Sequence, residues 1–316
     1  MPWPKGKSLR VTAVTAAAQL GGTERVLLDF AARAFEHDIA LRVVTPRHGP
    51  LVDILNEIGV PTEVVPGPTR MMRGSQRVGS LISIPGALVG LAQWARRLAR
   101  HPYVADTDLL YAVAFKAYVG TARQRVPVVW HLHEYPPTIT GPFWTSLGHR
   151  VPVALVANSR GVAAAWRPKY RGPPIGVVEN GVDLDRFRPR ERTGWIHQRL
   201  GLDRAKRLVG MPAVLAQWKG QLEVVHGFAR MAARYPDVDL VFVGGTIYDT
   251  VAERDFEARL RGAIARANAR LGKRVHLLPF QTKVELVYPE MDAVVHYSLR
   301  PEAFGRVILE AMACGV

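Results

Sequence analysis

Short apolar runs rich in β-branched residues alternate with amphipathic segments along this chain, and the alternation begins a second time near residue 205. A strand, helix, strand rhythm is typical of parallel sheets covered by helices. The chain is therefore expected to be an α/β protein. Strands are predicted at residues 9–16, 40–45, 62–65, 109–113, 126–133, 153–157, 208–211, 238–243, 275–278 and 293–297, and helices at 25–35, 221–234, 251–271 and 283–291.

The chain length also favours two domains, because 316 residues exceed what one hydrophobic core usually organises. The second start of the rhythm predicts two Rossmann-like domains, 1–180 and 181–316, with a hinge in residues 180–189. A single cysteine, Cys314, rules out a disulfide within the chain. No apolar signal segment follows Met1, so a cytoplasmic protein is expected.

The formal net charge of +15 favours acidic partners such as phosphorylated ligands or anionic lipid. Residues 66–104 contain six arginines and no acidic residue. A generally basic surface is the alternative. No nucleic-acid reading motif accompanies the charge, so nucleic acid is not expected as a partner. The six are Arg70, Arg73, Arg77, Arg96, Arg97 and Arg100.

Residues 78–95 carry no charge and form the one membrane candidate in the sequence. Pro85, three glycines and Gln93 lower their hydrophobicity, and their length is at the lower limit for a bilayer span. Three alternatives remain: a spanning segment, a helix resting on anionic lipid through its flanking arginines, and an ordinary core helix.

Two glutamates lie eight positions apart near the end of the chain, with a glycine between them. Pro301 cannot lie inside a helix, so the apolar run that follows predicts a helix beginning near Gly305. Glu302 then precedes the helix and Glu310 lies inside it. A helix N-terminus suits a phosphate or an anionic sugar nucleotide. The alternative is an amphipathic helix whose glutamates are solvated.

The run S-L-R-P-E-A-F-G-R-V-I-L-E-A-M-A-C-G at 298–315 resembles the E-x7-E signature of retaining glycosyltransferases of the GT-B fold, in glycosyltransferase family 4. Residues 178–187, with N-G-V-D, are similar to that family's turn between domains. Residues 218–221, W-K-G-Q, are similar to its W-K-G-x motif. The resemblance covers nearly the whole chain and is weakest between residues 66 and 106.

This resemblance implies two Rossmann-like domains facing a central cleft, with 1–180 on the acceptor side and 181–316 binding the nucleotide sugar. It implies a hexosyltransferase that moves a sugar from a UDP- or GDP-sugar to a lipid-linked, polysaccharide or other hydroxyl acceptor, without metal or another cofactor. Peripheral contact with an anionic membrane is compatible with it. The alternatives are a sugar-nucleotide binding protein without transfer activity and a basic membrane-surface module.

The resemblance also implies roles for individual residues. Glu302 would hold donor-sugar hydroxyls and Glu310 the ribose. Lys219, with the amides near Phe304 and Gly305, would meet the diphosphate. The remaining implied contacts are His133 near the donor sugar, the loop residues Gly21 and Gly22 near the diphosphate or acceptor, and Gly244, Pro279 and Phe280 at the nucleotide.

Two of these positions have other interpretations. Gly21 and Gly22 follow the first predicted strand and would also suit a tight turn. His131 and His133 alternate on a strand and so share one face, as metal ligands could, but no third ligand is evident. A structural histidine pair is the alternative, and no metal site is predicted.

The sequence departs from the family pattern in two places. Val214 stands five positions before Lys219, where relatives typically carry arginine; either Arg300 or Arg306 replaces that charge, or donor affinity is reduced. Similar enzymes also continue past the A-C-G segment with another strand and a returning helix. The second domain is therefore expected to be truncated, with an open sheet edge and a tendency to aggregate.

Overall fold

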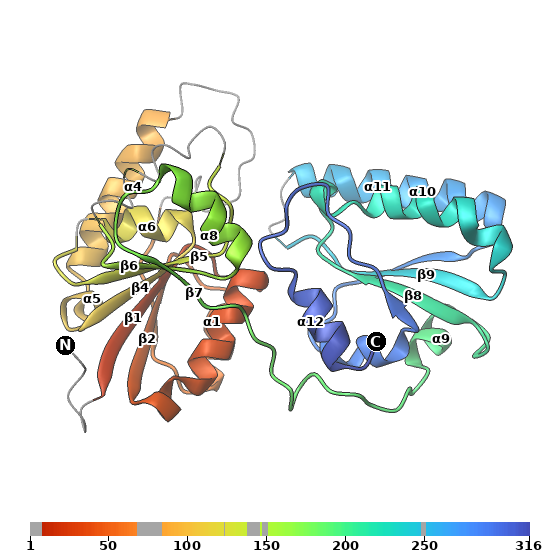
Figure 1. Ribbon diagram of the computed structural model, residues 1–316, viewed down its shortest axis with the longest axis horizontal. Coiled ribbons are helices and arrows are strands. Elements are labelled where there is room, and N and C mark those ends of the chain that lie inside the picture. The colour runs from red at the N-terminus through yellow and green to blue at the C-terminus, as the bar shows by residue number, and fades with distance from the viewer. Residues whose placement is uncertain (1–7, 68–83, 123, 138–145, 147–150, 248–250) are drawn as a thin grey trace. The chain divides into compact units, whose positions relative to one another are not determined.

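The computed structural model describes residues 8–67, 84–122, 124–137, 146, 151–247 and 251–316. The chain forms two compact units, Met1–Asn180 and Gly181–Val316. Each unit is a parallel α/β fold, as the alternation of apolar runs predicts, with helices packed on its sheet (Figure 1).

Unit 1 contains a seven-stranded parallel sheet in the order β3-β2-β1-β4-β5-β6-β7. The order reverses between β1 and β4, which is where open α/β sheets leave a crevice at the carboxyl ends of their strands. The strands are β1 (Leu9–Thr15), β2 (Ile39–Thr45), β3 (Thr62–Val64), β4 (Leu109–Val113), β5 (Val128–Leu132), β6 (Ala154–Ala157) and β7 (Ile175–Val177). The α-helices are α1 (Gly22–Arg33), α2 (Pro50–Glu57), α4 (Ile84–Ala99), α5 (Pro102–Ala105), α6 (Phe115–Thr121) and α8 (Arg160–Trp166).

Helix α4 contains the described part of the uncharged residues 78–95, for which a membrane span, a lipid-bound helix and a core helix were the alternatives. Leu91, Trp94 and Leu98 recur at helical spacing and are all buried. The indole nitrogen of Trp94 donates to the carbonyl of Val65 at 3.0 Å, and a Cβ on Gly120 would lie only 2.6 Å from the Trp94 ring. The described part of the stretch therefore packs as a core helix. Residues 78–83 lie outside the described residues.

No helix in the described part of the chain is long and apolar enough to cross a bilayer.

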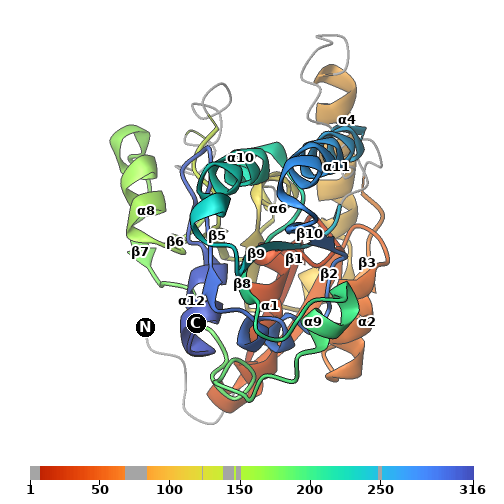
Figure 2. The same cartoon turned by 90° about the vertical axis from the view of Figure 1, so that its right-hand side faces the viewer.

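Unit 2 contains a four-stranded parallel sheet in the order β10-β9-β8-β11. Helices α10 and α11 lie side by side over one face of it (Figures 1 and 2). The strands are β8 (Arg207–Pro212), β9 (Val238–Val243), β10 (Val275–Leu278) and β11 (Ala293–Val294). The α-helices are α9 (Trp195–Leu200), α10 (Gln221–Met231), α11 (Val251–Leu271) and α12 (Arg306–Ala313).

Strand β9 shows how the two faces of this sheet are built. Leu240 and Phe242 point into the core beneath α10 and α11, whereas Val241 and Val243 belong to the core on the other face. Side chains alternate along a strand, so β9, which is apolar except for Asp239, contributes to both cores at once.

The helix predicted at residues 283–291 is wrong. The segment forms two 3-10 turns, Val284–Leu286 and Tyr288–Glu290. Pro289 supplies no backbone N–H and its ring would collide with the preceding helical turn, so an α-helix cannot continue through it. The buried carboxylate of Glu290 then accepts hydrogen bonds from the backbone of Thr193 and Gly194, at 2.7 and 2.9 Å, which anchors the connection into unit 2.

The strand predicted at 293–297 is shorter than expected, because only Ala293–Val294 pair with β8. The following residues leave the sheet and run across the turn at residues 217–220. Strand β7 and helix α9 are among the elements for which no bounds were predicted; both are short, and β7 spans only three residues.

Candidate functional site

A turn and a loop from distant parts of unit 2 pack together beside the carboxyl end of β8. The turn is the 3-10 segment Gln217–Lys219, which ends at Gly220 in the left-handed conformation with φ of 68°. The loop runs from Val295 to Gly305. A Cβ on Gly220 would lie 2.4 Å from the ring of Tyr297, and the Leu299 amide donates to the Trp218 carbonyl at 2.8 Å. Only glycine allows this approach.

The contact brings a cation and an anion together. The Lys219 ammonium donates to Glu302 Oε2 at 2.6 Å, and both side chains are largely buried, with exposed fractions of 14% and 25%. The same ammonium lies 4.1 Å from the centre of the Trp218 ring. Charge-assisted bonds in partly buried positions are stronger than those between neutral groups, so the pair holds the turn and the loop in register.

Two further polar side chains of the loop face Glu302. Ser298 Oγ donates to Glu302 Oε2 at 3.0 Å, and His296 Nε2 lies 3.4 Å from the same oxygen. Burial by itself would raise the pKa of Glu302, but His296, Lys219 and Ser298 together outweigh it and lower that pKa to about 2. Glu302 is therefore an ionised acceptor at any ordinary pH.

Helix α12 begins directly after this loop. Gly305 caps its start with φ of 81°, and a Cβ there would lie 3.3 Å from Ile308 Cδ1 and 3.6 Å from Glu302 Cγ. The first turn of a helix offers N–H groups without intrahelical partners and the positive end of the dipole. The N-terminus of α12, which suits an anion, thus lies beside the Lys219–Glu302 pair.

Glu310 points to the buried side of α12. Tyr288 Oη donates to Glu310 Oε2 at 2.6 Å, and Arg306 Nε donates to Oε1 at 3.3 Å. The alternative of two solvated glutamates is therefore wrong for both residues. Glu310 holds α12 to the turn Tyr288–Glu290, and a carboxylate with two partners retains lone pairs for one more hydroxyl.

The glycine pair after β9 lies between two neighbouring strand ends. A Cβ on Gly244 would lie 1.8 Å from the Ala213 carbonyl oxygen, and one on Gly245 would lie 3.3 Å from Phe280 Cβ. Pro279 and Phe280 follow β10, and Phe280 is exposed. The carboxyl ends of β8, β9 and β10 therefore lie close together, and the exposed ring of Phe280 lies beside them.

In unit 1, Gly21 caps helix α1 and Gly22 is its first residue. The Gly21 amide donates to the buried carboxylate of Glu24 at 3.1 Å, and burial raises the pKa of Glu24 to about 7. Nothing lies within 4 Å of a Cβ placed on Gly22. The loop therefore leaves open space at Gly22 and is held by the hydrogen bond from Gly21 to Glu24, a residue with no role predicted from the sequence.

His131 and His133 pack ring to ring at the end of β5, with centroids 3.9 Å apart. His131 Nδ1 is hydrogen-bonded to the Tyr111 hydroxyl, and burial lowers the pKa of His131 to about 4. Over the described ranges, no three His, Cys, Asp or Glu side chains gather in a metal-ligand arrangement. His131 is consequently a neutral core residue, and His133 is buried beside it.

The predicted residues therefore fall into two sets. Unit 2 brings Lys219, Glu302, Phe304 and Gly305 together, with Glu310 beneath them. Gly244, Pro279 and Phe280 lie at the adjacent strand ends, and Gly21, Gly22 and His133 belong to unit 1. His296 and Ser298 were not predicted from the sequence. Their alternation after the apolar residues Val294 and Val295 was the available signal, because positions two apart on an extended segment share a face.

Two family models match this chain. The one described as Glycosyltransferase Family 4 matches residues 20–186, more than half of the chain, and the one described as Glycosyl transferases group 1 matches residues 195–316. The chain belongs to glycosyltransferase family 4. The GT-B-type fold expected from the motifs at 178–187, 218–221 and 298–315 is thereby confirmed.

Known glycosyltransferases align with different shares of this chain. D-inositol 3-phosphate glycosyltransferase of Mycolicibacterium gilvum is 36% identical over 165 residues, which are 51% of this chain and 35% of the relative. The chain thus spans about a third of that curated relative. A crystal structure of Anabaena HepE with UDP and glucose aligns with a TM-score of 0.77 and 27% identity, over 97% of this chain and 79% of HepE.

A second HepE structure, in complex with UDP-glucose, is 26% identical over the same shares of both chains, with a TM-score of 0.77. The trehalose-6-phosphate structure from E. coli bound with UDP-2-fluoro glucose is 12% identical, covers 96% of this chain and 81% of its own, and has a TM-score of 0.71. That likeness concerns the fold alone.

In this glycosyltransferase, Val214 takes part in the structure through its backbone. The Val214 carbonyl accepts a 2.7 Å hydrogen bond from the buried side-chain amide of Gln221 at the start of α10. Arg306 is held by Glu310 and lies 3.4 Å from the Gly181 carbonyl, whereas Arg300 is exposed on the loop ahead of α12. Of the two candidate replacements, Arg300 has the more accessible side chain.

Proposed function

We propose that this family 4 glycosyltransferase transfers a hexosyl group from a UDP-sugar to a hydroxyl acceptor with retention of anomeric configuration. The observation that carries the proposal is the 2.6 Å pair of Lys219 and Glu302 beside the N-terminus of α12. A cation and a helix end suit a diphosphate, and an ionised carboxylate next to them suits sugar hydroxyls.

The diphosphate would lie between Lys219 and the first turn of α12. The ammonium has three donors and uses one for Glu302, so others can reach phosphate oxygens. As the glycosidic bond lengthens, negative charge builds on the leaving diphosphate. A fixed cation and a fixed helix dipole stabilise that charge without rearrangement, which lowers the barrier. Because these groups come from the protein, we propose transfer that needs no metal.

The donor sugar would lie against Glu302. Its pKa of about 2 keeps the carboxylate ionised, so it accepts hydrogen bonds from hydroxyls and cannot act as a general acid. A hydrolase pair of one acid and one nucleophile is therefore not part of the proposal. Instead, the leaving phosphate oxygen would take the proton of the acceptor hydroxyl on the same face of the sugar, which gives retention.

The nucleotide would extend toward the strand ends that carry Gly244, Pro279 and Phe280. Phe280 is 40% exposed and offers an aromatic surface to a base. The lone pairs left on Glu310 suit ribose hydroxyls. UDP is the nucleotide that we propose, since the HepE structures contain UDP and UDP-glucose. The acceptor class is a polyol, glycan or lipid-linked hydroxyl.

A second candidate function is nucleotide-sugar binding without transfer, and Val214 favours it. An apolar residue there leaves the diphosphate with one cation fewer than relatives typically supply. Incubation with UDP-glucose and a panel of hydroxyl acceptors separates the two. We expect UDP release and a glucoside with the α configuration, read from its proton coupling constants. A β-linked product would contradict retention, and UDP-glucose binding without turnover would establish the second function.

A further inference from the structure

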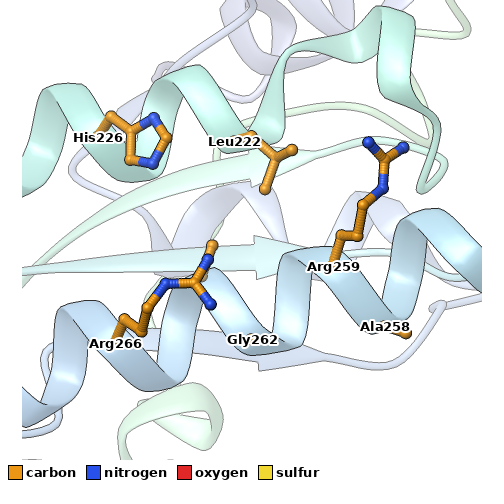
Figure 3. Close-up of a pocket in the computed structure, with 7 residues that line it drawn as sticks. Leu222, His226, Ala258, Arg259, Gly262 and Arg266 are labelled. Carbon is orange, nitrogen blue, oxygen red and sulfur yellow. The ribbon is translucent and has the colours of Figure 1, made fainter.

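A groove of about 460 Å³ lies between α10 and α11, on the helical layer of unit 2 (Figure 3). Its walls come from two helices that no part of the proposed donor site uses beyond the start of α10. Seven residues line it: Leu222, His226, Ala258, Arg259, Gly262, Ala263 and Arg266.

Helical spacing explains why these residues meet. Leu222 and His226 are four positions apart on α10, and Arg259, Gly262 and Arg266 follow at three and four positions on α11, so each set shares one face. Figure 3 shows the side chains of Arg259 and Arg266 extending from α11 toward α10. Gly262 contributes no side chain, and a Cβ there would already lie 3.4 Å from Arg266 Nη1.

The groove carries uncompensated positive charge. No lining residue is acidic, and within the described ranges no carboxylate forms an ion pair with Arg259 or Arg266. By contrast, Arg261 on a neighbouring face of α11 pairs with Glu257 at 2.7 Å. Two guanidinium groups and an imidazole at one recess favour an anion that accepts several hydrogen bonds.

We propose that this groove binds a small phosphate ester. Its phosphate would be held by Arg266, Arg259 and His226, and its carbon skeleton would rest on the apolar floor of Leu222 and Ala263. The volume is within the range of about 300–1,000 Å³ that small-molecule sites occupy. The apolar surface is recessed between the helices, so a small ligand suits it better than a flat lipid surface.

Arg259 also connects the groove with the turn that carries Lys219. Its Nη2 donates to Gln217 Oε1 at 3.2 Å, and Gln217 begins the 3-10 turn that ends at Lys219. A substitution of Arg259 would therefore disturb both places. Arg266 is the better residue to change, because it lies two helical turns farther along α11, away from Gln217.

The test is a titration of the full chain with glycerol 2-phosphate, followed by NMR or calorimetry. We expect saturable binding that Arg266→Gln weakens about tenfold or more, the usual effect of one charge-assisted hydrogen bond. Gly262→Leu, which fills the groove and keeps its charges, should abolish it. Arg270→Gln, on the same helix outside the groove, and Lys219→Met, in the proposed donor site, should leave it unchanged.

Three results would overturn the proposal. The first is an affinity that neither Arg266→Gln nor Gly262→Leu changes. The second is binding lost in Lys219→Met, because the ester would then occupy the proposed donor site. The third is sedimentation with phosphatidylglycerol vesicles that depends on Arg266 while glycerol 2-phosphate does not bind, since the groove would then serve a membrane surface. None of these results depends on transfer activity.

Discussion

Lys219 Nζ and Glu302 Oε2 are 2.6 Å apart although 83 positions separate the two residues in the chain. The pair joins the turn after β8 to the loop before α12. It places a cation beside the loop that leads into α12 and keeps the carboxylate of Glu302 ionised. Under the proposed function, the cation would meet the diphosphate and the carboxylate would meet the sugar.

Glu302→Gln is expected to lower the turnover number about 100-fold or more, a typical loss when one group that stabilises a transition state is removed. The amide keeps the size of the side chain but not its charge, so the fold should persist. Steady-state kinetics with UDP-glucose measure the effect. Glu223→Gln, an exposed substitution on α10, is the matched control and should retain wild-type turnover.

Glu24 predicts an unusual pH dependence of stability in unit 1. Its pKa is raised from 4.5 to about 7 in the folded protein, so the unfolded chain loses this proton at a lower pH than the folded protein does. The free energy of unfolding therefore falls as pH rises between about 4.5 and 7. The shift corresponds to about 3 kcal/mol. Urea unfolding at pH 5 and pH 8 should show this loss in the wild type.

Glu24→Gln should remove most of that difference, because its side chain can still accept the Gly21 hydrogen bond without titrating. An equal loss of stability between pH 5 and pH 8 in both proteins would show that another group is responsible.

Gly220→Ala should weaken UDP binding as well as stability. Gly220 has φ of 68°, and the added methyl group would overlap the Tyr297 ring, which would push the loop away from Lys219. Gly201 has a similar φ of 66° but nothing within 4 Å of its Cβ position. Gly201→Ala should therefore lose only about 1 kcal/mol for the left-handed backbone and retain UDP affinity. Equal UDP affinity in both variants would contradict this.

Tyr288→Phe removes the hydroxyl that donates to Glu310 and leaves a buried carboxylate with one partner fewer. The free energy of unfolding should fall by about 1–3 kcal/mol. Tyr235→Phe, at an exposed position, should change it by less than about 0.5 kcal/mol. Chemical denaturation followed by tryptophan fluorescence measures both. A loss no larger than that of Tyr235→Phe would mean that Glu310 is not anchored through Tyr288.

Much of the fold could be predicted from the sequence, since it depends on local pattern. The strands 109–113, 238–243 and 275–278 and the helix 251–271 match the observed elements residue for residue, because sharp changes in polarity bound them. The prediction was wrong at 283–291, where the apolar pattern suggested a helix that Pro289 interrupts.

The site was predicted less completely than the fold, for a physical reason. Sequence motifs indicated Lys219 and Glu302 separately, but their ion pair and the contact of Gly220 with Tyr297 depend on how two segments pack in three dimensions. His296 and Ser298 alternate along the chain, but only the packed loop brings both side chains to Glu302. Glu24 was not predicted at all, because its burial comes from the packing of the whole unit.

Calorimetric titration with UDP and UDP-glucose tests the central claim most directly, in the wild type, Lys219→Met and Glu302→Gln. We expect the wild type to bind both ligands, and Lys219→Met to lose about tenfold or more in affinity for each. Glu302→Gln should retain UDP but lose any preference for UDP-glucose. Failure of the wild type to bind either ligand, or affinities that neither substitution changes, would contradict the account.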